Sequence, residues 1–234
     1  MQKVALITGT GSVIGKALAE LLLSENYLIF GYSRTNQIEN KNFTFTKIDL
    51  SDMEAVQKLQ FPNVNVAFDV LLVNNAATIG SILPIDKKTN EEILREYNLN
   101  IISPTLLSRK FINNYSDNKK LLINIGSGAA NKAIASWSTY CATKSGLDML
   151  TEVIQKEKHE SLKVFSIHPG VVNTNMQEEI RKSDADFFPI KQQFIDYYSK
   201  NELFSVDFVA LKIFQIIAKN EDFKEIILNL RGFE

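Results

Sequence analysis

Short apolar runs and amphipathic stretches alternate along the entire chain. The first run, residues 4–7, is apolar throughout and stops at Thr8-Gly9, as a buried strand does. Stretches with apolar residues at helical spacing follow such runs. The pattern predicts strands at residues 4–7, 27–32, 43–48, 66–73, 121–125, 164–167 and 225–230, and helices at 14–24, 53–59, 90–115, 140–158 and 206–218.

This alternation predicts a parallel β-sheet that is covered by helices on both faces. We therefore expect an α/β fold, a Rossmann-type doubly wound parallel sheet, in a single domain over residues 1–234. The strand at 43–48 alternates apolar and polar residues, so it should lie near an edge of the sheet. Ser51 and Asp52 can cap the helix that follows. Pro104 predicts an irregularity in the long helix.

The amino-acid composition and the net charge limit the kinds of partner that the protein can bind. With 234 residues, 45% hydrophobic content and a formal net charge of −1, the chain can bury a substantial core and has neither a basic face for nucleic acid nor an acidic tail. The single cysteine, Cys141, excludes an intramolecular disulfide and fits a reducing compartment. The N-terminal apolar run is too short for a signal peptide, and no window approaches the roughly 20 apolar residues that span a bilayer. We expect a cytoplasmic protein that binds neither nucleic acid nor membrane.

The turn after the first predicted strand, Thr8-Gly-Thr-Gly-Ser-Val-Ile-Gly15, is rich in glycine. Glycine permits a tight turn and lets a pyrophosphate approach the backbone. The phosphates then lie at a helix N-terminus, where free N–H groups and the helix dipole favour negative charge. Because this turn opens a βαβ pattern, it predicts dinucleotide binding.

The end of the second predicted strand indicates which dinucleotide is bound. A carboxylate at this place would bind a ribose 2′-hydroxyl and repel a 2′-phosphate, but the chain has none there. Arg34 can instead fork onto a 2′-phosphate, with the hydroxyls of Ser33 and Thr35 assisting. This arrangement predicts NADP(H) as the cofactor.

Candidate chemistry lies between residues 127 and 144. On a helix, Tyr140 and Lys144 would share one face, one turn apart. An ammonium close to a phenol lowers the phenol pKa from about 10, which makes tyrosine a usable general acid. The Ser127 hydroxyl can hydrogen-bond the oxygen that Tyr140 protonates, so the set would reduce a carbonyl group beside a hydride donor. The Tyr/Lys spacing alone also fits a half-buried tyrosine beside a solvated lysine.

These residues and several further motifs occur in the same order as in the short-chain dehydrogenase/reductase family. The chain resembles that family over nearly its full length. The motifs are Thr8-Gly9 with Gly15, Asp49-Leu50, Asn74-Asn75-Ala76-Ala77, Asn100, Ser127, Tyr140 with Lys144, and Pro169-Gly-Val-Val-Asn-Thr174. Each motif is common by itself, but the ordered set is very specific. The resemblance implies an NADP(H)-dependent oxidoreductase acting on CH–OH/C=O groups, with no metal ion.

The resemblance also implies a role for each matching residue. The catalytic set is Ser127, Tyr140, Lys144 and Asn100, with Asn100 anchoring a water that links Lys144 to solvent. The cofactor-binding set is Gly9, Ser12, Ile14, Gly15, Arg34, Asp49, Leu50, Asn75, Ala76, Tyr140, Lys144, Pro169, Val172 and Thr174. Residues 1–115 would form the cofactor half, and residues 116–234 the catalytic and substrate half.

A narrower resemblance points to the sepiapterin reductase and benzil reductase branch. It is carried by Ser127-Gly-Ala-Ala, Trp137-Ser-Thr-Tyr140-Cys and the stretch from Pro169 to Arg181. The expected substrate pocket contains Ser127, Trp137 and Tyr140, with Trp137 either an apolar wall or ordinary core. Residues 173–200 would form the lid of this family.

The substrate is the least determined part of the prediction. Animal sepiapterin reductases hold the pterin with a carboxylate near the C-terminus, and residues 227–233 offer none. This favours aromatic ketones or 1,2-diketones, with a pteridine as the alternative substrate. His168 is expected to be structural and Cys141 to serve packing. The helices at 90–115 and 140–158 build dimers or tetramers in this family, so we expect a homodimer or homotetramer.

Two residues depart from the family pattern. Val13 replaces the middle glycine of the turn, although a β-branched residue disfavours positive φ and crowds a close backbone approach. Gly11 is expected to absorb part of this strain. Ala77 replaces a glycine, which is a smaller change. Val13 also favours an alternative of another class, a regulatory NADP(H)-binding protein with weak catalysis, whereas the complete Ser127, Tyr140, Lys144 and Asn100 set argues against it.

Overall fold

The computed structural model describes residues 3–65 and 67–232 and forms one seven-stranded sheet. Its strands are β1 (Lys3–Thr8), β2 (Leu28–Ser33), β3 (Phe43–Lys47), β4 (Asp69–Asn74), β5 (Lys120–Ile125), β6 (Leu162–His168) and β7 (Ile227–Asn229). They lie in the order β3-β2-β1-β4-β5-β6-β7, and every neighbouring pair is parallel. The predicted doubly wound α/β fold in a single domain is confirmed.

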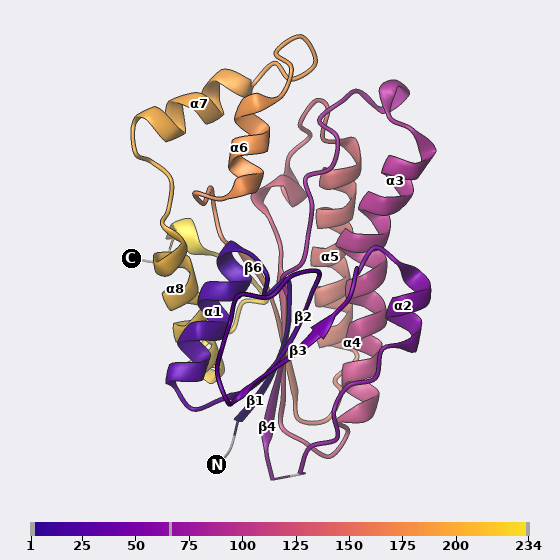
Figure 1. The fold of residues 1–234 in the computed structure, drawn as a ribbon, viewed down its shortest axis with the longest axis vertical. Coiled ribbons are helices and arrows are strands. Elements are labelled where there is room, and N and C mark those ends of the chain that lie inside the picture. The colour runs from indigo at the N-terminus through magenta and orange to yellow at the C-terminus, as the bar shows by residue number, and fades with distance from the viewer. Residues whose placement is uncertain (1–2, 66, 233–234) are drawn as a thin grey trace.

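Helices cover both faces of the sheet (Figure 1). One face carries α1 (Val13–Ser24) and α8 (Val206–Ala218). The other carries α2 (Met53–Lys58), α3 (Asn90–Tyr97), α4 (Ser103–Asn114) and α5 (Ser138–Lys156). Two further helices, α6 (Asn175–Lys182) and α7 (Lys191–Ser199), stand above the sheet. None of the described helices is long and apolar enough to cross a membrane.

The period-2 geometry of the strands explains the two apolar layers. In β1, Ala5 and Ile7 join the cluster beneath α1 and α8, whereas Val4 and Leu6 join the cluster on the opposite face. All six residues of β5 are buried, as expected for a central strand of a parallel sheet with both faces covered. The sheet is therefore rigid at its centre, and the loops at the carboxyl ends of its strands extend from a fixed base.

The structure corrects the predicted long helix at residues 90–115. The chain forms α3, then a π-helical turn, Asn98–Ile102, and then α4. The wider turn comes just before Pro104, which has no N–H and whose ring would clash with the Asn100 carbonyl in a regular helix. The irregularity expected from Pro104 is therefore present, but it begins upstream of the proline.

Other boundaries move by a few residues. The strand predicted at 66–73 begins at Asp69 because Asn65 closes a turn, with its side chain accepting from Ala67 N (2.9 Å); Val66 lies outside the described residues. The helix predicted at 140–158 is α5, which both begins and ends two residues earlier, at Ser138 and Lys156. As predicted, β3 is an edge strand. Asp52 caps α2 by accepting from the N–H groups of residues 54 and 55, whereas Ser51 does not cap it.

Candidate active site

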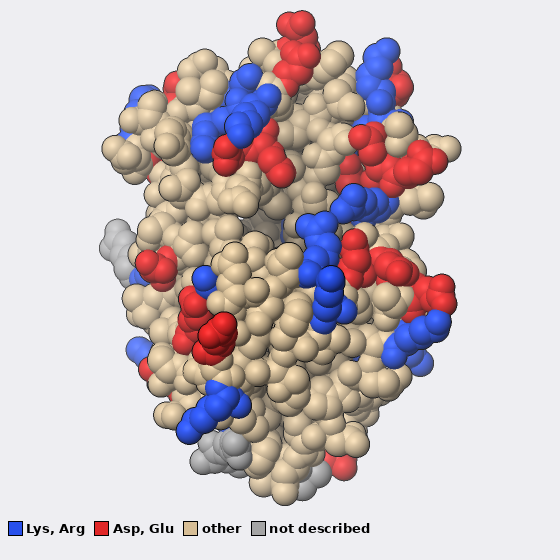
Figure 2. All heavy atoms as spheres, viewed as in Figure 1, with Lys and Arg blue, Asp and Glu red and all other residues tan. Residues whose placement is uncertain are grey.

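A cleft of about 1050 Å³ opens beyond the carboxyl ends of the strands. Lys and Arg side chains border the hollow near the middle of this face (Figure 2). Almost all of the predicted site residues line the cleft: Gly9, Ser12, Ile14, Arg34, Asp49, Leu50, Asn75, Ala76, Ser127, Trp137, Tyr140, Lys144, Pro169, Val172 and Thr174. Gly15 and Asn100 do not line the cleft, but each contacts a residue that does.

The glycine-rich turn has room for a phosphate group. Gly9 has a φ of +74°, and a Cβ there would meet the Asn75 amide nitrogen at 2.7 Å. Gly15 lets α1 pack against the turn, since a Cβ there would lie 2.4 Å from the Gly9 carbonyl oxygen. Ser12 is the N-cap of α1, and within the described chain its side chain makes no cap hydrogen bond. Ser12, Val13 and Ile14 line the cleft, so the N-terminus of α1, which Ser12 leaves uncapped, lies at the cleft wall, which fits the phosphates of a dinucleotide.

Val13 carries the strain of this turn. Its φ is +33°, in the left-handed region that disfavours a β-branched residue. The expectation that Gly11 absorbs this strain is wrong, because Gly11 does not have a positive φ. Gly11 is needed for a different reason: a Cβ at this position would lie 2.5 Å from the carbonyl oxygen of Thr35. The departure from the family pattern is therefore accommodated at Val13 itself.

Hydrogen bonds hold the loop after β4 against this turn. The Thr8 hydroxyl accepts from Asn75 N (2.9 Å) and Ala76 N (3.0 Å) and donates to the Val73 carbonyl (3.3 Å). The Asn75 amide donates back to the Thr8 carbonyl oxygen (3.0 Å). Two cofactor-side loops thus form one rigid wall.

The end of the cleft near β2 carries opposite charges. Asp49 accepts from the Ser51 N–H (2.9 Å) and hydroxyl (2.7 Å). Partial burial raises the Asp49 pKa, but these bonds and the charges of Arg34 and Arg95 outweigh it and bring the pKa below its usual value. Sequence reasoning missed Arg95, which also lines the cleft. The Ser33 hydroxyl donates to the Thr35 carbonyl (2.6 Å), so in this arrangement its hydrogen is not directed at a phosphate.

Tyr140, Lys144 and Ser127 meet in the middle of the cleft. Tyr140 and Lys144 are buried on one face of α5, and Lys144 Nζ lies 5.8 Å from the centroid of the Tyr140 ring. Lys144 Nζ donates to the carbonyl of Ile125 (2.7 Å), at the end of β5. Ser127 follows this strand, and its hydroxyl oxygen accepts from Ala129 N (3.2 Å). The sequence spacing of the three residues therefore corresponds to a real cluster.

The electrostatics of this cluster differ from the sequence-based expectation. Burial raises the pKa of the Tyr140 phenol, a hydrogen bond with Ser127 lowers it in part, and Cys141 raises it further. Burial lowers the pKa of Lys144 to about 8, against the opposing effect of Asp148. The expected lowering of the Tyr140 pKa by Lys144 is not realised, because the ammonium is directed at the Ile125 carbonyl and burial dominates the phenol.

Asn100 braces the cleft from behind. Its side-chain oxygen accepts from Thr78 N (2.9 Å), and its amide donates to the Thr78 carbonyl (2.9 Å) and to the Thr143 hydroxyl (3.4 Å). The Asn100 side chain is thus committed to protein partners rather than directed at a water. Thr78 lines the cleft, so Asn100 fixes the lining loop to α5.

The wall opposite the cofactor side is aromatic. Trp137 stacks on Phe188 (centroids 5.3 Å apart, planes at 12°) and lies edge-on to Tyr140 (5.5 Å). Phe194 packs against Trp137 (5.5 Å) and meets Tyr197 edge-on (6.0 Å), and both residues line the cleft. Trp137 is therefore at once core and wall. The predicted segment 173–200 supplies α6 and α7, and its Phe188 and Phe194 join the apolar cluster that contains Tyr140.

His168 and Cys141, both close to Tyr140 or the cleft, have the packed surroundings expected of structural residues. His168 is buried, and its Nε2 lies 2.8 Å from Asp148 Oδ2, within a cluster that includes Ser166. Cys141 is half-buried and packs against the aromatic cluster; burial raises its pKa, which keeps the thiol protonated.

Comparisons with known proteins agree with this geometry. The family model described as short chain dehydrogenase matches residues 3–185. A benzil reductase ((S)-benzoin forming) of Bacillus cereus is 31% identical over 237 aligned positions, covering 92% of this chain and 94% of that protein. A sepiapterin reductase of Rattus norvegicus is 29% identical over 208 positions, with 78% and 79% covered. A solved short-chain dehydrogenase/reductase of Saccharomyces cerevisiae matches with a TM-score of 0.82 at 18% identity, covering 99% of this chain and 97% of the other. The chain belongs to the short-chain dehydrogenase/reductase family, whose members bind a nicotinamide dinucleotide and act on CH–OH and C=O groups.

Proposed function

We propose that this protein is an NADPH-dependent carbonyl reductase whose substrates are aromatic ketones or 1,2-diketones of the benzil type. The observation that carries the proposal is the meeting of Tyr140, Ser127 and Lys144 beneath an aromatic wall formed by Trp137 and Phe194. The names of the benzil reductase relatives support the substrate class. Aryl rings pack well against such a wall in edge-on or offset geometry.

The residues divide the reaction between them. When bound in the cleft, NADPH would supply the hydride for the carbonyl carbon. Tyr140 donates its phenolic proton to the carbonyl oxygen, and the Ser127 hydroxyl hydrogen-bonds the same oxygen as negative charge develops on it. Lys144 carries its positive charge below about pH 8, and the phenolate left after the transfer takes a proton back from solvent. A phenol kept protonated by burial is suited to act as the acid in the reducing direction.

Arginine side chains support NADPH rather than NADH. Arg34 and Arg95 line the cleft at its β2 end, where β2 ends in Ser33 rather than in a carboxylate. A 2′-phosphate would be held there by charge-assisted hydrogen bonds. On the other side of the cleft, Val172 and Thr174 would hold the carboxamide.

The test is NADPH and NADH consumption with benzil, 1-phenyl-1,2-propanedione and sepiapterin. We expect turnover with the two diketones and a preference for NADPH. Preferred use of sepiapterin would instead indicate the pteridine reductase alternative. Sepiapterin is included because the relative from Rattus norvegicus is a sepiapterin reductase. Up to residue 232, where the described chain ends, the C-terminal segment offers Arg231 and no carboxylate to the cleft, which does not favour a pterin. Tight NADPH binding without turnover on any substrate would indicate the regulatory alternative.

We further propose that two or four copies of this chain associate through residues 90–115, which contain α3 and α4, and through α5. Leu94 and Met149, on these helices, are 62% and 59% exposed although apolar, and Val153 is 43% exposed. Exposed apolar side chains on adjacent helices are typical of a subunit contact. Sedimentation should give a dimer or tetramer that Leu94→Glu with Met149→Glu converts to a monomer. The free thiol of Cys141 is compatible with the cytoplasm, where we place the protein.

A further inference from the structure

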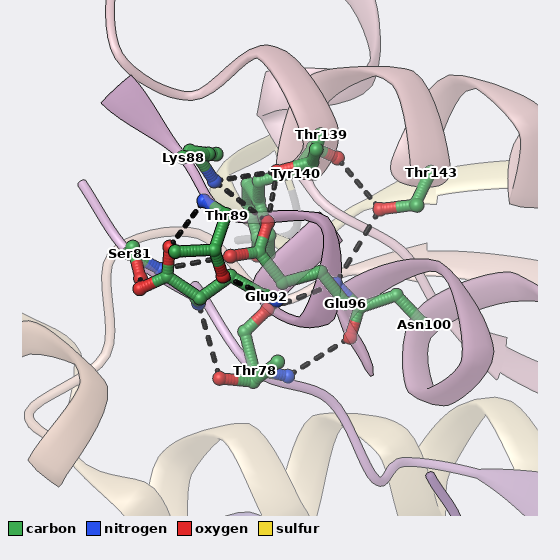
Figure 3. Close-up of polar contacts among 11 residues, drawn as sticks. Thr78, Ser81, Lys88, Thr89, Glu92, Glu96, Asn100, Thr139, Tyr140 and Thr143 are labelled. Atoms are coloured by element: carbon green, nitrogen blue, oxygen red, sulfur yellow. Dashed lines mark hydrogen bonds and ion pairs between the residues drawn. The ribbon is translucent and has the colours of Figure 1, made fainter. Parts of the chain in front are cut away.

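A buried ion pair stands behind the proposed proton donor (Figure 3). Lys88 Nζ lies 2.7 Å from Glu96 Oε2, and the two side chains are 0% and 4% exposed. Both groups meet the hydroxyl of Thr139: Lys88 Nζ donates to it (2.7 Å), and the hydroxyl donates to Glu96 Oε2. Thr139 is the residue immediately before Tyr140. We call Lys88, Glu96 and Thr139 the Thr139 clamp.

Stability is a weak explanation for this arrangement. Removing two charges from water costs several kcal/mol per ion, and apolar residues of similar volume often serve stability as well or better. What a fully satisfied buried network provides is a defined geometry. Glu96 Oε1 also accepts from Ser81 N (2.8 Å), and Gly80 packs so closely that a Cβ there would lie 2.0 Å from the Glu96 carboxyl carbon. The carboxylate is therefore fixed on several sides.

The clamp is one of two matching contacts that α5 makes, the first with α3 and the second with the π-helical turn that follows α3. Glu96 accepts a hydrogen bond from the Thr139 hydroxyl. Four residues further along both segments, the Asn100 amide donates a hydrogen bond to the Thr143 hydroxyl. Tyr140 is the residue after Thr139, just as Lys144 is the residue after Thr143. Each residue of the Tyr/Lys pair is thus preceded by a threonine that a neighbouring helix holds in place.

The N-terminus of α5 needs such a contact. Trp137 is its N-cap and makes no side-chain cap hydrogen bond, and the first turn of this fully described helix contains no acidic residue. Helix ends without caps fray readily. Tyr140 lies in that first turn, so the clamp adds directed hydrogen bonds to a helix end that is otherwise held by the aromatic packing of Trp137.

We propose that Lys88, Glu96 and Thr139 are positioning residues that fix the Tyr140 phenol against the substrate oxygen. The loop that carries Lys88 also carries Thr78 and Ile79, which line the cleft. The clamp therefore sets the separation between this loop and Tyr140. The inference rests on the proposed function, because it assigns Tyr140 as the proton donor.

The test compares Thr139→Val with Thr139→Ser and with Thr151→Val. Thr139→Val keeps the Lys88–Glu96 pair intact and removes only the hydroxyl that joins it to α5. Thr151 is a matched control, because it is a buried threonine of the same helix whose hydroxyl accepts from Asn124 (2.8 Å) away from the cleft. We expect Thr139→Val to slow single-turnover reduction by about tenfold or more while the NADPH Kd stays within about twofold, since small misplacements are costly in rate. Thr139→Ser should restore the rate, and Thr151→Val should keep it while lowering the melting temperature.

A readout without cofactor separates this inference from the proposed function. In protein labelled with ¹³Cζ-tyrosine, the Tyr140 resonance, assigned by its loss in Tyr140→Phe, should shift or broaden in Thr139→Val and remain in place in the other two variants. If the native protein reduces none of the substrates, the proposed function fails, but the resonance still decides whether the clamp positions Tyr140. A native rate and an unmoved resonance in Thr139→Val would overturn the clamp. Equal rate losses in Thr139→Val and Thr151→Val would also overturn it, because lower protein stability alone would then explain the slower reduction.

Discussion

Replacing Val13 by glycine tests whether the chain stores backbone strain at its phosphate-binding turn. Val13 has a φ of +33°, and such a conformation in a non-glycine residue costs about 1–3 kcal/mol. Glycine removes this cost but adds freedom to the unfolded chain, which takes back about 0.4–1 kcal/mol. The net gain in the free energy of unfolding is about 1 kcal/mol, which raises the melting temperature of a domain of this size by about 2–4 °C.

Cofactor affinity should respond less than stability. The strain exists in the protein without cofactor, so its relief acts on the free and bound forms alike. We expect the NADPH Kd of Val13→Gly to stay within about twofold of the native value, which corresponds to about 0.4 kcal/mol. Turnover at saturating NADPH should hardly change, because Ser127 and Tyr140 are untouched. Thermal unfolding and calorimetric titration measure the two effects separately.

Two control variants make the result interpretable. Val13→Ala retains a Cβ at positive φ, so it should recover less than half of the gain in melting temperature. Lys158 is exposed just beyond α5 with a φ of +55°, far along this helix from Tyr140. Lys158→Gly should therefore raise the melting temperature without changing the NADPH Kd. A less stable Val13→Gly protein, or one that binds NADPH more than about tenfold more weakly, would refute the reasoning and make the valine side chain a working part of the turn.

Three further predictions concern the proposed chemistry. Tyr140→Phe should reduce turnover by at least about 10²-fold while NADPH binding persists; wild-type-like turnover would remove Tyr140 from the mechanism. Arg34→Asp should weaken NADPH by about 2 kcal/mol or more but leave NADH nearly unchanged, as measured by competitive titration; equal losses would place Arg34 away from the 2′-phosphate. Because burial lowers the pKa of Lys144 to about 8, its ammonium form is present below that pH, and kcat/KM for NADPH should fall as the pH rises through it. Lys144→Arg should shift that fall to higher pH, and a flat native profile up to pH 10 would contradict the assignment.

Local sequence signals were sufficient for the fold and for most of the cleft. Strands such as β5 are apolar and short enough to be recognised without tertiary information. The residues from Ser127 to Lys144 are close in sequence and lie on one strand end and one helix. Their meeting therefore follows from local geometry.

Features that depend on packing between distant segments could not be predicted. Pro104 signals an irregularity in the sequence, but its form as a π-helical turn over Asn98–Ile102, which packs against α5, has no local signal. The direction of the Lys144 ammonium, and with it the Tyr140 pKa, is set by a carbonyl at the end of β5. Lys88 and Glu96 lie in a charged stretch that resembles a solvated surface, and Thr139 adds no signal of its own. Only the folded chain reveals that these charges face inward.

The two supports of Tyr140 differ in chemistry, and this difference has a consequence for substrate range. On one side, the polar Thr139 clamp holds the first turn of α5 through hydrogen bonds with fixed directions. On the other side, Trp137 contacts the Tyr140 ring through an aromatic cluster that includes Phe188 and Phe194 from the segment above the cleft. Aromatic packing tolerates changes of shape better than a hydrogen-bonded ion pair does, since it is less directional. Substitutions at Phe194 should therefore alter which aryl ketones enter the cleft without displacing the phenol, whereas substitutions in the clamp should slow every substrate by a similar factor.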